Sequence, residues 1–325
     1  MNAVESRDNY KKQLEQAASE GGSYSDFLDK SKSAADRIQA ITTVHGLPTE
    51  DQVNEIAAVI TDKDEDAGVR SAALSRAVSY VGKNETWIRD VIDILVDASE
   101  PVSLRRDCLS LLQQLKFTSQ LFNAMRPEYL DALRSLVDTP NNVLRSEVLE
   151  VLSLEKDEYS QRRLFEGLTD PTKALLPEAK TLQLLGNDIH SEYYPEFRNI
   201  AQNASDVSIR KQAVRLLASD TSSAELLAGM LRDKNENEDI RQASAAALHA
   251  LNPASFHAQA RELILDTTES DNLRAASITA LTHFADPDEL QKDTQLTEHI
   301  QQMAQHNHVG PLQAAVARYN AAAAK

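Results

Sequence analysis

The 325-residue sequence has few of the residues that mark loops, disulfides or β-rich folds. Its single cysteine, Cys108, excludes an internal disulfide. Nine glycines and ten prolines are too few for a loop-rich or β-rich fold of this length. Aromatic residues make up only 5% of the chain, so a core has to be built from Leu, Ile, Val and Ala. Because Ala and unbranched residues lose little freedom in a helix, this composition favours an all-α fold.

Long apolar runs are also missing. No stretch of about 18 apolar residues appears, so no membrane-spanning helix is expected. The first residues, Met1 to Asp8, lack the apolar segment of a Sec-type signal peptide. The sequence therefore predicts a cytoplasmic protein.

Basic residues are outnumbered by acidic ones. Lys and Arg total 34 and Asp and Glu total 50, which gives a formal net charge of −16. Both halves share this excess, so no acidic tail accounts for it. Phosphate binding needs a basic face, and nucleic acid is therefore disfavoured as a partner. A protein or peptide partner, in particular a basic one, suits an acidic body better.

An internal repeat is the main feature that the sequence does have. Arg recurs at intervals of 31–40 residues with a small or slim residue three positions later, and in every copy but the first a β-branched residue or Leu precedes it. The arginines of this series are Arg37, Arg70, Arg105, Arg145, Arg210, Arg241 and Arg274. The interval of 65 residues after Arg145 predicts one further copy without arginine, near residues 175–179.

Helical periodicity on both sides of each arginine defines the repeating unit. Positions 0, 3, 4 and 7 counted from the arginine share one helical face, and the small residue there lets a neighbouring helix approach closely. Another amphipathic stretch precedes each such helix. The repeating unit is thus helix, turn, helix. Stacking of these units buries the apolar faces that a single helix pair would leave exposed. We predict an α-α superhelix, or solenoid, of about nine antiparallel helix pairs.

This pattern of acidic turn, arginine and small residue resembles HEAT repeats, and in particular the short HEAT-like repeats of bacterial scaffold and bilin-lyase proteins. The resemblance covers a single array over residues 31–325 and leaves residues 1–30 as an N-terminal helical cap. It implies that each arginine pairs with an Asp of its turn, such as Asp66 before Arg70 or Asp206 before Arg210, and so ties neighbouring turns together. It also implies that the second helix of each pair lines a concave face.

Two surfaces are candidates for binding a partner. Exposed positions of the second helices are expected one, five and eight residues after the arginine; they include Arg106, Gln113, Lys211, Arg215, Gln242 and His249. The three cations among them form a predicted basic spot for an acidic or phosphorylated segment, unless they only solvate the helix face. The alternative surface is the acidic turn edge, which includes residues 62–66 and 235–239. It either recruits a basic partner or only caps helices.

Signals for catalysis and metal binding are weak. No phosphate loop, dinucleotide-binding turn or nucleophile elbow is found, so neither an enzyme nor a cofactor is predicted. No His is followed by the Glu found in the iron-binding pairs of HEAT-like hydroxylases, and the surface pair His306 and His308 lacks a partner ligand. No metal site is predicted, and Cys108 is interpreted as a buried structural thiol.

The sequence thus predicts a protein–protein interaction scaffold or adaptor. Alternatives are an enzyme on the same scaffold, similar to bilin lyases or DNA glycosylases, or an acidic inhibitor of the immunity type. A DNA glycosylase needs a basic groove that is rich in aromatic residues, whereas this chain is acidic and has one tryptophan.

Overall fold

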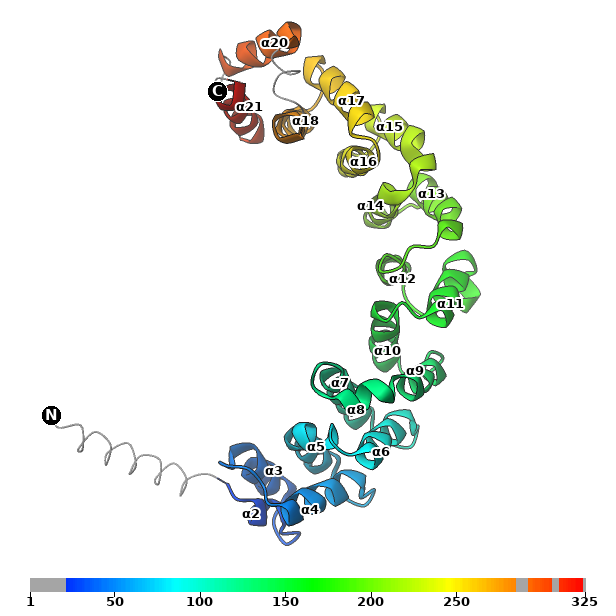
Figure 1. The fold of residues 1–325 in the computed structure, drawn as a ribbon. Coiled ribbons are helices and arrows are strands. Elements are labelled where there is room, and N and C mark those ends of the chain that lie inside the picture. Colours follow the sequence, from blue (N-terminus) through cyan, green and yellow to red (C-terminus); the bar gives the residue numbers. More distant parts are fainter. Residues whose placement is uncertain (1–21, 285–291, 306–309, 324–325) are drawn as a thin grey trace, which may run out of the picture. The chain divides into compact units, whose positions relative to one another are not determined.

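The structure, a computed structural model, describes residues 22–284, 292–305 and 310–323. Every regular element among these residues is a helix, and none is a strand (Figure 1). The chain divides into two compact units, Met1–Ser160 and Gln161–Lys325. Most of the cap predicted over residues 1–30 lies outside the described residues, as do His306 and His308, and the boundary at residue 30 stays a prediction.

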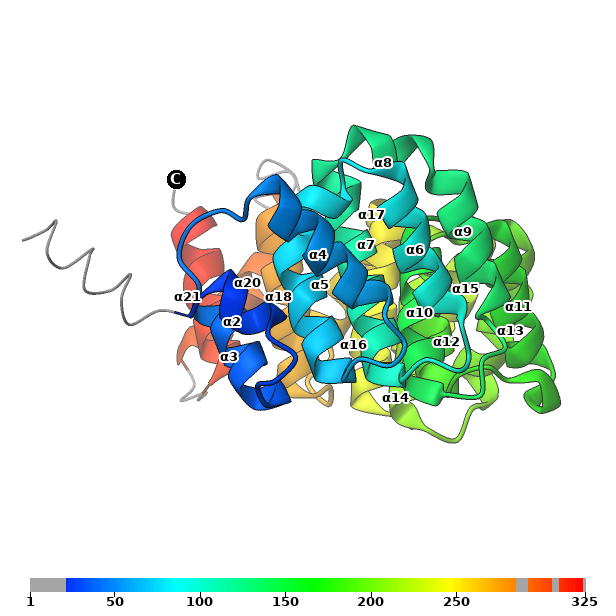
Figure 2. The same cartoon turned by 90° about the horizontal axis from the view of Figure 1, so that it is seen from below.

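Unit 1 contains four helix pairs. They are α2 (Tyr24–Leu28) with α3 (Ala34–Thr43), α4 (Glu50–Thr61) with α5 (Ala67–Val81), α6 (Glu85–Val96) with α7 (Val102–Thr118), and α8 (Gln120–Ala124) plus α9 (Arg126–Ser135) with α10 (Asn142–Leu154). The first helices α4, α6 and α9 contact one another in turn (Figure 2), and the second helices α3, α5, α7 and α10 do the same. The unit is therefore a two-layered stack.

Unit 2 repeats this plan. Its pairs are α11 (Glu158–Thr169, which begins in the last residues of unit 1) with α12 (Glu178–Leu185), α13 (Tyr194–Asn203) with α14 (Val207–Leu216), α15 (Ala224–Arg232) with α16 (Glu238–Leu251), α17 (Pro253–Leu265) with α18 (Asp271–Phe284), and α20 (Thr294–Gln305) with α21 (Pro311–Ala323). Short 3₁₀ turns lie at Pro171–Lys173, Ser191–Tyr193, Leu217–Ser219 and Thr221–Ser223. Nine pairs are described in all, which confirms the predicted all-α solenoid of about nine pairs.

Burial follows the periodicity of the sequence. The small residues three positions after the arginines are all buried: Ala40, Ala73, Cys108, Val148, Ala213, Ser244 and Ser277. Burial raises the pKa of the Cys108 thiol to about 12, so the thiol stays protonated as predicted for a structural residue. Helix starts are capped as well. Thr49 forms a capping box with Gln52 at the start of α4, and this satisfies backbone N–H groups there.

Two absences apply to the described part of the chain. No helix there combines the length and apolar character needed to cross a bilayer. No three His, Cys, Asp or Glu side chains of these residues come together as a metal site.

Candidate functional site

The seven arginines of the series occupy one position, the fourth residue of the second helix of their pair. From there the Nε group reaches back to a carbonyl near the end of the first helix of the same pair. These bonds run from Arg37 to Phe27, Arg70 to Ile60, Arg105 to Leu95, Arg210 to Ala201 and Arg241 to Leu231, at 2.7–2.9 Å. Since carbonyls in the last turn of a helix lack partners within it, each arginine satisfies one and joins the two helices of its pair.

Four arginines also form ion pairs with the next helix pair. Their terminal nitrogens donate to both carboxylate oxygens of a glutamate two residues before the next second helix. The pairs are Arg37–Glu65, Arg70–Glu100, Arg210–Glu236 and Arg241–Glu269. We call these four links the Arg–Glu ladder. Two parallel N–H···O bonds suit the planar guanidinium, so each link fixes neighbouring turns at a defined orientation.

The predicted aspartate partners were wrong. Asp66 accepts hydrogen bonds from the backbone N–H groups of Gly68 and Val69, at 2.9 and 3.2 Å, and so caps α5. Asp206 caps α14 in the same way. Because these carboxylates already serve the helix start, the arginine extends past its own turn and meets the glutamate of the following one.

Glu65, Glu236 and Glu269 of the ladder have pKa values below their ordinary 4.5. For Glu65 the main cause is the hydrogen bonds from Arg37. For Glu236 and Glu269 burial acts to raise the pKa, but hydrogen bonds from Arg210 or Arg241 and from a backbone N–H outweigh it. All three carboxylates are therefore more acidic in the folded chain than in the unfolded chain.

Stability should consequently depend on pH. A depressed folded-state pKa contributes stability that is fully present above the ordinary value of 4.5 and is lost as the pH falls through the lowered value. We expect the thermal unfolding midpoint to be constant near neutrality and to drop between about pH 5 and pH 3. A midpoint that stays unchanged down to about pH 3 would contradict this assignment.

The ladder is interrupted in the middle of the chain. Where the glutamate would precede α10 the sequence has Pro140, and within the described residues the Arg105 side chain donates a hydrogen bond only to Leu95. Arg145 instead donates to the Thr139 carbonyl and to Asn142 in its own turn. In α12 the fourth residue is Thr181, whose hydroxyl contacts the Leu176 carbonyl at 3.4 Å, and this is the predicted copy without arginine.

Arg105 should therefore matter less for stability than Arg70. Arg105→Met removes one hydrogen bond and a buried cation, and burial already lowers the pKa of this guanidinium. No carboxylate is left behind, so we expect a loss of about 1 kcal/mol or less in the free energy of unfolding. Urea unfolding of Arg105→Met and Arg70→Met, measured under the same conditions, checks this prediction. Equal losses of unfolding free energy in the two variants would show that pairing with Glu100 does not make Arg70 more important than Arg105.

The predicted binding residues of unit 1 lie on α7. Arg106 is directed at Glu147 of α10, with Nε at 2.9 Å from a carboxylate oxygen, and so links two neighbouring second helices. Gln113 is exposed on the same helix.

The remaining predicted residues belong to unit 2. Lys211 and Arg215 lie one turn apart on α14, where the Lys211 ammonium pairs with Asp239 of α16 at 3.0 Å and Arg215 is exposed. On α16, Gln242 donates to Glu238 at 3.2 Å, and the His249 ring lies 5.2 Å from that of Phe256. The predicted basic spot joins Arg106 to Lys211 and Arg215, which lie in different units, and it stays a prediction.

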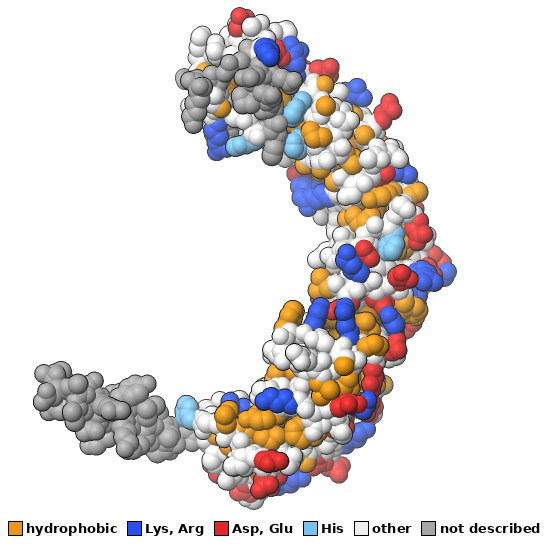
Figure 3. All heavy atoms as spheres, viewed as in Figure 1, with side chains coloured by type: hydrophobic (Ala, Val, Ile, Leu, Met, Phe, Trp, Pro, Cys, Tyr) orange, Lys and Arg blue, Asp and Glu red, His pale blue; other side chains and the backbone are white. Residues whose placement is uncertain are grey.

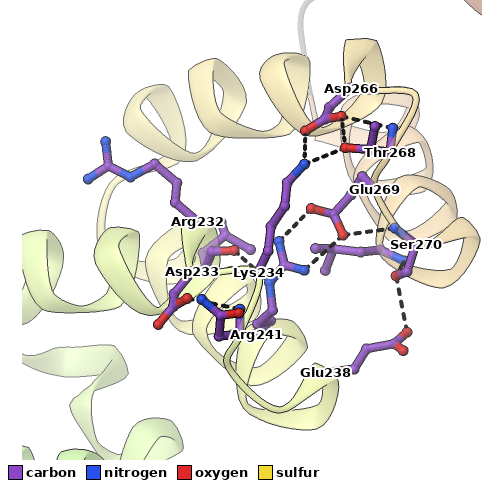
Figure 4. A network of polar contacts seen from close by, with 12 residues as sticks. Arg232, Asp233, Lys234, Glu238, Arg241, Asp266, Thr268, Glu269 and Ser270 are labelled. Atoms are coloured by element: carbon purple, nitrogen blue, oxygen red, sulfur yellow. Dashed lines mark hydrogen bonds and ion pairs between the residues drawn. The ribbon is translucent and has the colours of Figure 1, made fainter.

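At the acidic turn edge, carboxylates form links between helix pairs. Besides the ladder glutamates, Asp62 pairs with Lys30, Asp97 with Lys63 and Asp266 with Lys234, each across neighbouring turns. A pocket of about 320 Å³ opens between two such turns of unit 2 (Figure 4); it is lined by Lys234, Glu236, Glu238, Arg241, Thr268, Glu269 and Ser270. Arg241 and Glu269 of the lining pair with each other, while Lys234 pairs with Asp266 and Glu236 with Arg210. Because most of the lining charges belong to links between helix pairs, this pocket does not indicate a ligand.

Among its described residues, unit 1 exposes five large apolar side chains, and two of them, which the sequence analysis did not select, lie at the ends of neighbouring second helices. Phe117 is 83% exposed at the end of α7, and Leu154 is 67% exposed at the end of α10. Phe117 continues the outward face of α7 eleven residues beyond Arg106, so the same helical spacing carried one turn past Gln113 would have found it. In Figure 3, hydrophobic and basic side chains lie side by side on the visible face of unit 1.

Ion pairs hold the ends of these two helices together. The Lys116 ammonium lies 2.5 Å from a carboxylate oxygen of Glu155, and Arg126 pairs with the other oxygen. Burial acts to raise the pKa of Glu155, but the two cations outweigh it and the pKa is lowered. We call Lys116, Phe117, Arg126, Leu154 and Glu155 the end patch. It places two exposed apolar groups around a fixed cluster of charges.

No protein-family model and no curated protein sequence matches this chain. Among solved structures, the complex of CpcE and CpcF of phycocyanin lyase from Nostoc aligns over 86% of this chain and 99% of that chain, with 14% identity and a TM-score of 0.36. Importin beta aligns over 93% of this chain and 47% of that chain, with 12% identity and a TM-score of 0.43.

Human deoxyhypusine hydroxylase in complex with glycerol aligns over 76% of this chain and 99% of that chain, with 12% identity and a TM-score of 0.31. The fold assignment rests on the contacts within the chain itself: antiparallel helix pairs, stacked layers within each unit, and an arginine at the start of seven second helices. The chain is an all-α array of stacked antiparallel helix pairs, and its fold is similar to that of HEAT repeats.

Proposed function

We propose that the chain is a protein-interaction scaffold and that its partner binds unit 1 at the end patch. The observation that carries the proposal is the exposure of Phe117 and Leu154 beside the Lys116–Glu155 ion pair. Large apolar side chains that lie together on a surface and are bordered by polar groups are typical of interaction sites, and aromatic residues often dominate the binding energy.

The end patch is also preorganised. Cross-helix pairs tie α7 to α10 near both ends of the contact, Arg106–Glu147 toward their starts and Lys116–Glu155 at their ends. A partner therefore meets side chains that are already held in place, and less conformational entropy is lost on binding. The acidic turn edge supports binding less well, because most of its carboxylates already pair with cations of neighbouring turns.

The test uses the full chain in its native cell. A photo-crosslinking residue at position 117 should capture a partner, whereas the same residue at position 143, exposed at the start of α10, should not. Phe117→Ser with Leu154→Ser should reduce recovery of that partner by about tenfold or more, since the central anchors of an interface carry most of its affinity.

Val143→Ser is the matched control, because it also removes an exposed apolar side chain from α10. All changed side chains are exposed, so the unfolding free energy should stay within about 0.5 kcal/mol of the wild type. Equal recovery from the double variant and the wild type would overturn the proposal.

A further inference from the structure

We infer that the segment bound at the end patch is acidic and amphipathic, with apolar side chains against Phe117 and Leu154 and carboxylates facing Lys116 and Arg126. This inference rests on the proposed function and adds the chemistry of the partner. It departs from the basic partner that the net charge suggests.

The first argument is the asymmetry of exposure within the charged cluster. The side chains of Lys116 and Arg126 are 40% and 48% exposed, while the Glu155 side chain that pairs with both is only 5% exposed. Two cations share one carboxylate, so one positive charge is left over. The negative charge is buried and the positive charges face outward, so the end patch presents positive charge to a partner.

The neighbouring side chains extend this charge. Lys156 follows Glu155 and is exposed. At the end of the preceding second helix, the Lys83 ammonium lies 6.0 Å from the centre of the Tyr80 ring, and the Gly82 carbonyl accepts a hydrogen bond from Ser119, the residue that follows α7. Two of the acidic residues that flank the cluster in the sequence are paired with other cations: Glu128 with Arg89 and Asp157 with Arg134. Basic and aromatic groups therefore continue along the ends of α5, α7 and α10.

The second argument concerns distance. At physiological salt the field of the whole chain is screened over roughly 8 Å, whereas two charges in contact interact much more strongly. The net charge of −16 thus slows the approach of an acidic partner but does not determine the contact itself. Lys116 also lies 5.8 Å from the centre of the Phe117 ring, so a carboxylate bound there lies beside the apolar anchor.

The experiment selects binders from a displayed library of random peptides on the full chain, and repeats the selection on the Phe117→Ser, Leu154→Ser double variant. We expect the wild type to enrich peptides that carry Asp or Glu next to Leu, Ile or Phe, and the double variant to lose this enrichment. Enriched peptides are then synthesised with each Glu and Asp changed to Gln or Asn. The neutral versions should bind the wild type about tenfold more weakly, which corresponds to about 1.4 kcal/mol.

Because these charges are changed in the peptide, the protein is unchanged, and altered folding cannot account for weaker binding. Arg126→Gln, which leaves Lys116 on Glu155, should reduce the difference between acidic and neutral peptides. Enrichment of basic or neutral peptides, a neutral version that binds as tightly as the acidic one, or no enrichment overturns the inference.

The two proposals remain distinguishable. If basic or neutral peptides are enriched but lost with the double variant, the end patch is still the binding surface and only the acidic chemistry fails. If acidic peptides are enriched equally on wild type and double variant, both proposals fail.

Discussion

Arg70→Met is expected to lower the free energy of unfolding by about 3–5 kcal/mol, the largest effect of any substitution considered for this chain. The Arg70 and Glu100 side chains are 3% and 4% exposed and are joined by two hydrogen bonds of 2.6 and 2.9 Å. Methionine replaces the stem of the side chain but leaves the Glu100 carboxylate buried without its cation. Such an uncompensated charge destabilises far more than the loss of an exposed pair.

The control is the double variant Arg70→Met, Glu100→Leu, which removes both charges. Buried ion pairs replaced by apolar residues of similar volume are often neutral for stability, so the double variant should lie near the wild type. Urea unfolding followed by circular dichroism gives all three free energies. A single variant as stable as the double variant would show that the buried pair is not formed.

Ala73→Leu should destabilise the chain by about 1–3 kcal/mol. Ala73 lies three residues after Arg70, is fully buried, and belongs to the small-residue position at which α5 meets its neighbours. A leucine there forces the helices apart, because a close-packed interior has no room for three further carbon atoms. The thermal unfolding midpoint of the full chain measures the effect.

Ser75→Leu on the same helix is the matched control. Ser75 is exposed, so the added side chain meets no neighbour and the change should stay within about 0.5 kcal/mol. If Ala73→Leu were as mild as Ser75→Leu, the small residues would not mark the helix contacts.

The repeat could be predicted because it depends on local periodicity. Seven of the nine described second helices have an arginine at the fourth position, a buried small residue three positions later and an apolar residue seven positions later, and these spacings are visible in the sequence. Thr181 shows the limit of this reasoning. Only the interval between Arg145 and Arg210 indicated that copy, and the structure was needed to show which residue takes the arginine position.

The partners of the arginines could not be predicted, since they lie 26 to 30 residues further along the chain. In the sequence Glu65 and Glu100 look like any other acidic turn residue, and the Asp at the helix start is the nearer candidate. Capping of the helix determines which of the two acidic residues pairs with the arginine. An aspartate that accepts from backbone N–H groups is not available, and the glutamate of the next turn takes its place.

The end patch was missed for a different reason. The predicted exposed positions of the second helices extend only to eight residues after the arginine. Helix α7 continues to Thr118 and exposes Phe117 in its last turn. Net charge was misleading as well. Many acidic side chains pair within the turn edge, and at the end patch the cations are the exposed members of their ion pairs.

Hydrogen–deuterium exchange of the full chain, free and with the captured partner, tests the central claim most directly. The prediction is that the partner slows exchange in the peptides that cover residues 113–118 and 150–157, where α7 and α10 end. Slower exchange confined to the turns at residues 62–66 and 235–239, with the ends of α7 and α10 unchanged, would contradict it.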